Sequence, residues 1–334
     1  MTALNESVDR IAAEKGFSGV VRIDRGDDVE FARAYGLAHR GHQFANAIDT
    51  QFAIASGTKG LTALTVMSLI EDGTLDMTTT ARSLLRRDLS LIDDRVTLEQ
   101  LLAHRSGIGD YLDEEEQQHV NEYAMTVPAN ELTTTEQYVQ VLDGYPSKFA
   151  PNERFSYSNS GYVILALIAE RATGSPFHQL VKQRVCEPAG MRDTEFMRSD
   201  ELTSRAAVGY LAAEGSTTNI VHLPVMGSGD GGIYSTAADI GSMWKAMFGG
   251  LIVSIDRIAE MVDPRSDSKA QSMRYGLGFW LHRRSEAVIL EGSDAGVSFR
   301  TVHYRTEHIT YTVMSNVTDA AWPIARYLDK SFTP

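Results

Sequence analysis

Residues 54–61 read Ile-Ala-Ser-Gly-Thr-Lys-Gly-Leu and begin a mostly apolar stretch that ends at the Glu-Asp-Gly of residues 71–73. Apolar residues recur along it at helical spacing and glycine commonly ends a helix, so the stretch predicts a buried helix. Ser56 and Lys59 lie three residues apart, which places them on one helix face within contact of each other. A serine hydroxyl becomes a nucleophile when a base takes its proton, and a lysine of depressed pKa is such a base.

This spacing alone does not define a function, because a helix-capping serine beside a solvated lysine has the same pattern. A second segment adds to it: residues 155–162 read Phe-Ser-Tyr-Ser-Asn-Ser-Gly-Tyr and precede another apolar helix, expected at 161–172. Tyr157 and Asn159 are two residues apart, so in an extended or turn segment both side chains point the same way. A tyrosine relays protons if a cation such as Lys59 lowers its pKa. The alternative is a packed tyrosine with Asn159 as helix cap.

The composition of the 334 residues narrows the choice of partners. The formal net charge is −13, which argues against nucleic acid and anionic membranes. No window approaches about 18 continuous apolar residues and no signal-peptide pattern begins the chain, so we expect no membrane span and a cytoplasmic location. The single cysteine, Cys186, excludes an internal disulfide. The sequence leaves the oligomeric state open.

The order of the expected elements indicates how the chain is organised. Strands are predicted at 18–23 and 29–36 and again between 275 and 316, whereas the segment from 75 to 236 has helical periodicity and no convincing strand. We therefore expect an α+β fold, an α/β sandwich whose antiparallel sheet is built from both termini. Residues 1–75 and 236–334 would form the α/β domain and residues 76–235 an inserted, mainly helical domain, with the active site in the cleft between them.

Several segments in this order resemble the serine β-lactamase and penicillin-binding protein superfamily. The resemblance is strongest to its class C β-lactamase branch, which includes family VIII carboxylesterases, D-alanyl-D-alanine carboxypeptidases and D-aminopeptidases. It covers roughly residues 17–316, and beyond the two motifs above it rests on residues 50–55, 69–76, 101–107, 231–239 and 275–279. Each motif is weak alone, but their joint occurrence in the right order is specific.

The resemblance implies a role for each motif residue. Ser56 would be the acylated nucleophile and Lys59 its base. Tyr157 would pass protons to the leaving group and help to activate water, and Asn159 would orient Lys59 and the substrate. His104 lies in a matching loop and is interpreted as structural. No cofactor or metal is implied, since there is no His-Glu-x-x-His pattern or cluster of histidines.

The third motif departs from the family pattern. Where the family has Lys-Thr-Gly or His-x-Gly, this sequence has Leu290, Glu291 and Gly292. The leucine offers no donor to a substrate carboxylate, and Glu291, if it faces the cleft, would repel one by on the order of 4 kcal/mol at 4 Å and an effective dielectric of about 20. Gly292 would still allow close approach, and the main-chain N–H groups of Ser56 and Ser293 could still bind an oxyanion.

The sequence therefore predicts a serine hydrolase that forms an acyl-enzyme on a small ester, amide or short peptide. Neutral substrates, or substrates with a positive group near Glu291, are expected to be preferred. The alternatives are a β-lactamase, a D-alanyl-D-alanine carboxypeptidase or a D-aminopeptidase. A catalytically silent binding scaffold is a further alternative, which the altered third motif favours and the intact Ser, Lys, Tyr and Asn set disfavours.

Overall fold

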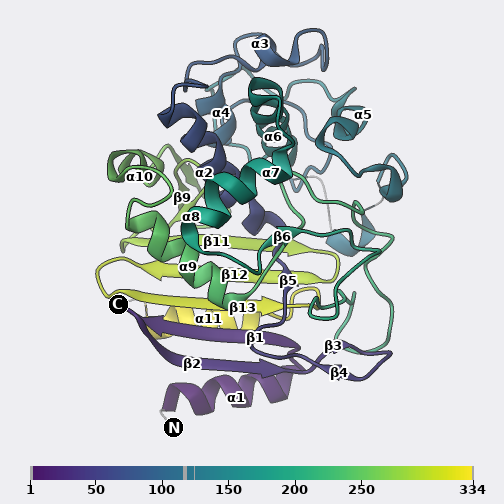
Figure 1. Ribbon diagram of the computed structural model, residues 1–334, viewed down its shortest axis with the longest axis vertical. Helices are drawn as coiled ribbons and strands as arrows, with labels where there is room; N and C mark the ends of the chain where they lie inside the picture. Colours follow the sequence, from purple (N-terminus) through teal and green to yellow (C-terminus); the bar gives the residue numbers. More distant parts are fainter. Residues whose placement is uncertain (1–2, 116–118, 124, 333–334) are drawn as a thin grey trace.

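The computed structural model describes residues 3–115, 119–123 and 125–332. In these residues an eight-stranded antiparallel sheet has the order β2-β1-β13-β12-β11-β10-β9-β8, and it occupies the lower half of the molecule in Figure 1. Its strands are β1 (Gly19–Arg25), β2 (Asp28–Tyr35), β8 (Ser266–Ser268), β9 (Met273–Tyr275), β10 (Trp280–Leu281), β11 (Ala287–Asp294), β12 (Val297–Tyr304) and β13 (Ile309–Ser315). The N-terminal and C-terminal strands meet where β1 pairs with β13 in register, Gly19 opposite Ser315.

Helices cover both faces of the sheet and gather above it (Figure 1). The α-helices are α1 (Ala3–Lys15), α2 (Thr58–Glu71), α3 (Ala81–Leu85), α4 (Leu98–Leu102), α5 (Val139–Leu142), α6 (Asn159–Thr173), α7 (Phe177–Val181), α8 (Glu187–Ala189), α9 (Ala237–Phe248), α10 (Ile255–Met261) and α11 (Trp322–Phe332). Short 3-10 turns are η1 (Ala55–Gly57), η2 (Val120–Glu122), η3 (Ala129–Glu131) and η4 (Thr135–Tyr138), and η5 (Lys182–Cys186) is a π-helical turn.

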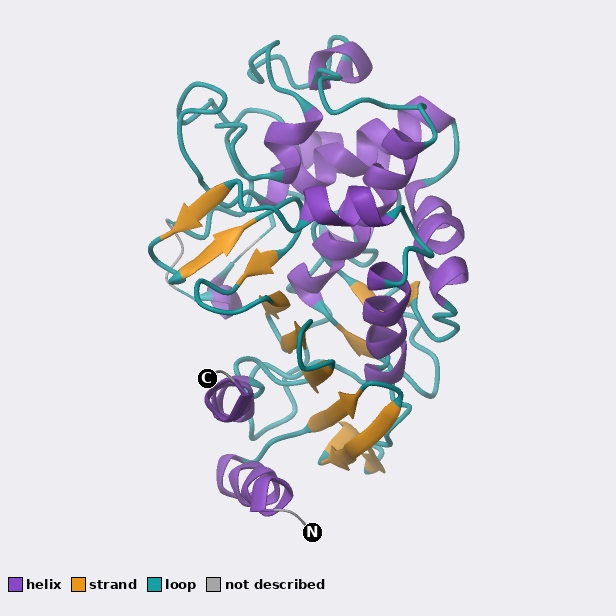
Figure 2. Ribbon diagram, turned by 90° about the vertical axis from the view of Figure 1, so that its left-hand side faces the viewer, coloured by secondary structure: helices purple, strands orange, loops and turns teal. Residues whose placement is uncertain are grey.

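The alternation of side chains along the strands divides the core in two. On one face α1 and α11, which lie side by side in Figure 2, cover the sheet with a cluster that includes Val8 and Leu328. On the other face α9 packs on β1 and β13, and the indole N–H of Trp244 donates to Thr301 Oγ1 over 3.0 Å. Because successive residues of a strand point to opposite faces, one strand supplies both clusters.

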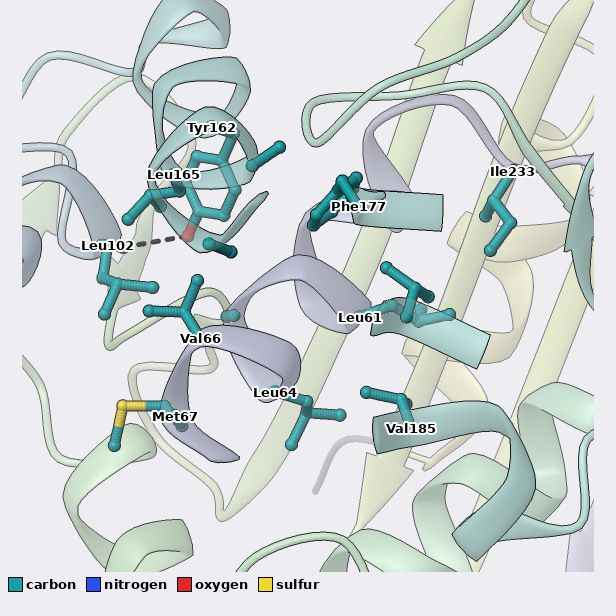
Figure 3. Close-up of a cluster of buried hydrophobic side chains, with 14 of the residues drawn as sticks. Leu61, Leu64, Val66, Met67, Leu102, Tyr162, Leu165, Phe177, Val185 and Ile233 are labelled. Carbon is teal, nitrogen blue, oxygen red and sulfur yellow. Dashed lines mark hydrogen bonds between the residues drawn. The ribbon is translucent and has the colours of Figure 1, made fainter. Parts of the chain in front are cut away.

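Helix α2 is the centre of the helical half. All of its residues from Thr58 to Ile70 are buried, so apolar side chains project from every side of it. Figure 3 shows Leu61, Leu64, Val66 and Met67 of α2 against residues of the surrounding helices, and Tyr162 of α6 donates to Leu102 O over 2.9 Å. A fully buried helix fixes its first turn, which holds Lys59, and the η1 turn directly before it, which holds Ser56, as firmly as any part of the core.

The predicted α+β sheet built from both termini is confirmed, but the middle of the chain is not free of strands. In this segment β7 (Ile233–Ser235) pairs with β6 (Glu195–Phe196) and also with β5 (Phe52–Ala53), which precedes it. Earlier in the chain, β3 (Leu37–His39) pairs with β4 (Phe44–Ala45). Strands of two or three residues are too short to show alternation in the sequence. Among the described residues, no helix is long and apolar enough to cross a lipid bilayer.

Candidate active site

The turn before α2 aims Ser56 into a cavity. Ser56 lies in η1, which precedes α2, and Ala55 before it has φ 44°, a left-handed conformation that costs a non-glycine residue on the order of 1 kcal/mol. The turn is held by a hydrogen bond from Gly57 N to Ile54 O of 2.9 Å and one from Thr58 Oγ1 to Ala55 O of 2.8 Å. Strain of this kind persists where the surroundings over-determine the backbone, and here it presents the Ser56 hydroxyl at the cavity wall.

Lys59 is buried, and its Nζ makes three hydrogen bonds. The partners are Ser56 Oγ at 2.9 Å, Asn159 Oδ1 at 2.7 Å and the main-chain oxygen of Asp230 at 2.8 Å. Burial lowers the pKa of Lys59 from its ordinary value, although nearby carboxyl groups, first among them Asp230, oppose this shift. The predicted contact between Ser56 and Lys59 is therefore present, and the amine is biased toward its neutral form.

Tyr157 approaches both residues. It lines the cavity together with Ser56, and its ring centre lies 4.9 Å from Lys59 Nζ. The ring is held between His104, at 4.3 Å between ring centres, and Trp280, at 5.9 Å. The expectation that Lys59 lowers the pKa of Tyr157 is wrong: desolvation, followed by the negative charge of Glu114, raises that pKa well above its usual value. Tyr157 is a neutral phenol, because Lys59 is itself desolvated and carboxyl groups surround the pair.

Asn159 is fixed at the start of α6 by its neighbours. The helix cap is Ser158, whose Oγ accepts from Gly161 N, so Asn159 is not the cap and its side chain is free to face Lys59. Its main-chain N–H donates to Asp110 Oδ2 over 2.7 Å, and its Nδ2 donates to Leu112 O over 2.9 Å. With Nδ2 turned toward Leu112, Oδ1 points at the lysine.

The third-motif segment on β11 forms one wall of the cavity. Leu290 is buried against α2, and a Cβ placed at Gly60 would lie 2.6 Å from Leu290 Cδ1. Gly292 passes close to the nucleophile turn, since a Cβ there would lie 2.8 Å from Ser56 N. Glu291, Gly292 and Ser293 all line the cavity with Ser56. Leu290 points into the core rather than toward a substrate.

Glu291 does not present a free charge to the cavity. Its carboxylate forms an ion pair with Arg300, which also lies 3.1 Å from Asp329 Oδ2. The repulsion expected from an isolated Glu291 is therefore reduced, because the guanidinium offsets it.

Carboxyl groups other than Glu291 face the cavity, and the sequence analysis did not identify them. Glu114, Asp230 and Asp294 line the same cavity, which has a volume of about 1120 Å³. Desolvation raises the pKa of all three, that of Asp294 to about 7. The sequence positions of two of them could have pointed to the site. Asp294 follows the third motif by two residues, and Asp230 lies in the glycine-rich run at 227–232.

His104 is buried and packs among aromatic rings. Its Nδ1 accepts from Ser158 N over 3.1 Å, and its ring contacts Tyr157, Tyr162 and Tyr275. Burial lowers its pKa well below the usual value, so the ring is neutral and supports Tyr157. Within the described ranges, no three His, Cys, Asp or Glu side chains group as metal ligands would.

An α+β sandwich in which a serine, a lysine, a tyrosine and an asparagine gather beside the interior strand β11 defines a class of protein, and comparison with known proteins names that class. The chain belongs to the Beta-lactamase family, which it matches over residues 4–330. Members of this family are serine hydrolases.

Individual relatives cover the chain to different extents. PbpX of Bacillus subtilis (strain 168) is 28% identical over 279 residues, which are 83% of this chain and 65% of PbpX. Esterase EstB of Burkholderia gladioli is 30% identical over 214 residues, which are 62% of this chain and 54% of EstB. The crystal structure of a penicillin binding protein from Bacillus halodurans has a TM-score of 0.91 at 29% identity and covers 97% of this chain and 100% of that chain. This agreement confirms the fold, whereas this chain spans less than two thirds of PbpX and about half of EstB.

Proposed function

We propose that this protein is a serine hydrolase that cleaves esters or amides through an acyl-enzyme at Ser56. One observation carries the proposal: Lys59 Nζ lies 2.9 Å from Ser56 Oγ while its two other hydrogen bonds go to carbonyl oxygens. A neutral amine has two N–H donors and one lone pair. With both donors held by Asn159 Oδ1 and Asp230 O, the lone pair faces the serine hydroxyl.

The reaction follows from this arrangement. Lys59 takes the proton of Ser56, and Oγ attacks the carbonyl carbon of the substrate. The main-chain N–H groups of Ser56 and Ser293 stabilise the oxyanion of the tetrahedral intermediate. As the intermediate collapses, the hydroxyl of Tyr157 gives its proton to the leaving group and recovers one from the Lys59 ammonium. Water then attacks the carbonyl carbon of the acyl-enzyme, and its proton passes to Lys59 by way of Tyr157. The bond from the acyl group to Ser56 Oγ breaks, and that oxygen takes a proton back from Lys59.

The charges around the cavity favour substrates without a carboxylate. Leu290 offers no cation, Arg300 is engaged by Glu291 and Asp329, and Glu114, Asp230 and Asp294 face the space in front of Ser56. The cationic side chains among the lining residues are exposed ones: Arg154, Lys269 and Arg326. We therefore propose neutral or positively charged esters and amides as the preferred class, ahead of the β-lactams and C-terminal peptide carboxylates that the family's third motif would bind.

A fluorophosphonate probe tests the proposal. Wild-type protein should be labelled once, and Ser56→Ala should not be labelled and should not hydrolyse p-nitrophenyl acetate. Ser199→Ala removes another serine that lines the cavity and should be labelled like wild type. Labelling that persists in Ser56→Ala, or no labelling of the wild type, would leave the silent binding scaffold as the better account.

A further inference from the structure

A short segment, residues 110–112, hydrogen-bonds both residues whose carbonyl oxygens accept from Lys59, namely Asn159 and Asp230. On one side Asp110 accepts from the main-chain N–H groups of Asn159, over 2.7 Å, and Ser160, over 2.9 Å. The carbonyl of Leu112 accepts from Asn159 Nδ2 over 2.9 Å. These bonds fix the backbone and the amide plane of Asn159, so they fix Oδ1 against the lysine.

On its other side the segment holds Asp230. The hydroxyl of Tyr111 donates to Asp230 Oδ2 over 2.5 Å, and the main-chain N–H of Tyr111 donates to Ser160 Oγ over 3.0 Å. Tyr111 and Asp230 are both buried. The backbone of Asp230 lies in a tight turn in which Ser228 N donates to Gly231 O over 3.0 Å. A side chain anchored in such a turn fixes the direction of the Asp230 carbonyl that accepts from Lys59.

The contacts form a closed ring: Lys59 to Asn159, Asn159 to the 110–112 segment, Tyr111 to Asp230, and Asp230 back to Lys59. We propose that Tyr111 is a positioning residue that, through Asp230, sets the geometry and the proton affinity of the lysine beside the reactive serine. Tyr111 does this without contacting Lys59. The inference deepens the proposed function by naming what adjusts its base.

The charged groups that face Lys59 determine whether its pKa rises or falls when the Tyr111 hydroxyl is removed. Four carboxyl groups raise the pKa of Lys59 against the desolvation that lowers it, namely those of Asp230, Glu114, Asp110 and Asp294. The neutral rings of Tyr157 and His104 lie beside them. The Tyr111 hydroxyl stabilises the Asp230 carboxylate. Without that hydroxyl Asp230 is protonated more readily, its negative charge supports the ammonium less, and Lys59 loses its proton at lower pH.

The titration of Lys59 can be measured without any turnover. The chain has seven lysines, so protein labelled with 13C at lysine Cε gives a short set of NMR signals, and the Lys59 signal is assigned by its loss in Lys59→Ala. Tyr111→Phe keeps the ring and removes one hydroxyl. Asp230→Asn removes the charge itself. Tyr35→Phe is the matched control, because the Tyr35 hydroxyl donates to Asp9 over 2.7 Å and does not line the cavity.

We expect the Lys59 midpoint to fall by about half a pH unit or more in Tyr111→Phe, further in Asp230→Asn, and not at all in Tyr35→Phe. The acidic limb of kcat against pH should move the same way in the first two variants, and kcat should fall more than KM rises. A Lys59 midpoint in Tyr111→Phe and Asp230→Asn equal to that of wild type would overturn the inference. If Ser56 proves unreactive while the midpoint moves as expected, the proposed function fails and the positioning role stands.

Discussion

Glu291 and Arg300 lie opposite each other on β11 and β12, and their side chains form an ion pair at the edge of the cavity. The pair is mostly buried, with 20% of the Glu291 side chain and 13% of the Arg300 side chain exposed. Arg300 also bonds Asp329 of α11, so the C-terminal helix takes part in neutralising the third-motif position. The carboxyl group that acts on a substrate is therefore expected three residues further along β11, at Asp294, which also lines the cavity.

Charge selectivity should depend on Asp294 more than on Glu291. At pH 8, where Asp294 is ionised, Asp294→Asn should raise the ratio of kcat/KM for a carboxylated cephalosporin to that for p-nitrophenyl acetate about tenfold, because one repulsive charge near Ser56 is removed. In Glu291→Gln the ratio should change less than about threefold, since Arg300 already offsets that charge. Steady-state kinetics on both substrates measures this. A wild type that prefers the cephalosporin, or a larger change in Glu291→Gln, would contradict the charge argument.

Asp294 should also make the stability of the folded protein depend on pH. Its pKa is raised to about 7 by burial, against 3.8 for an ordinary aspartate, so the folded protein binds the extra proton between these values. The unfolded chain is already ionised there, and stability falls as pH rises from about 4 to about 7. Asp294→Asn removes this loss of stability. The free energy of unfolding of Asp294→Asn minus that of wild type should therefore be larger at pH 8 than at pH 5, by about 1 kcal/mol or more. Urea unfolding at the two pH values checks it, and an equal difference at both would refute it.

The β11 wall should tolerate no side chain at Gly292. A Cβ there would lie 2.8 Å from Ser56 N, so Gly292→Ala must push the strand away from the nucleophile turn. We expect kcat for p-nitrophenyl acetate to fall at least about 100-fold, the order expected when an oxyanion donor is displaced. Gly161→Ala is the control, because the nearest atom to its added Cβ is 3.5 Å away and the residue lies in α6. Full activity in Gly292→Ala would mean that the strand does not shape the oxyanion site.

The sequence was sufficient for the parts of this site that rest on local spacing. Ser56 and Lys59 meet because three residues make one turn, and the family order of motifs placed Tyr157 and Asn159 beside them. The limits of the helical segment stay a prediction. What the sequence could not show was which groups face Lys59 from elsewhere, because Asp230 lies 171 positions away. Nor could it show that Arg300 pairs with Glu291, since that depends on the register of β11 and β12.

The role of Tyr157 as a neutral proton donor can be tested by removing its hydroxyl alone. Tyr157→Phe keeps the ring that packs on His104 and Trp280, so its melting temperature should stay close to that of wild type. Its kcat should fall by about 10²–10⁴-fold, as expected for loss of a positioned proton donor. Tyr275→Phe is the control, because that hydroxyl meets Tyr162 at 3.3 Å in the same aromatic cluster and should be dispensable.

The pH profile separates a phenol from a tyrosinate. Since burial and Glu114 raise the pKa of Tyr157 well above its ordinary value, wild-type activity should rise as Lys59 loses its proton and then stay level to about pH 9. The rising limb should persist in Tyr157→Phe at its lower rate, because it belongs to the lysine. A limb that disappears with the hydroxyl would instead assign the titration to Tyr157 and require the anion that its surroundings disfavour.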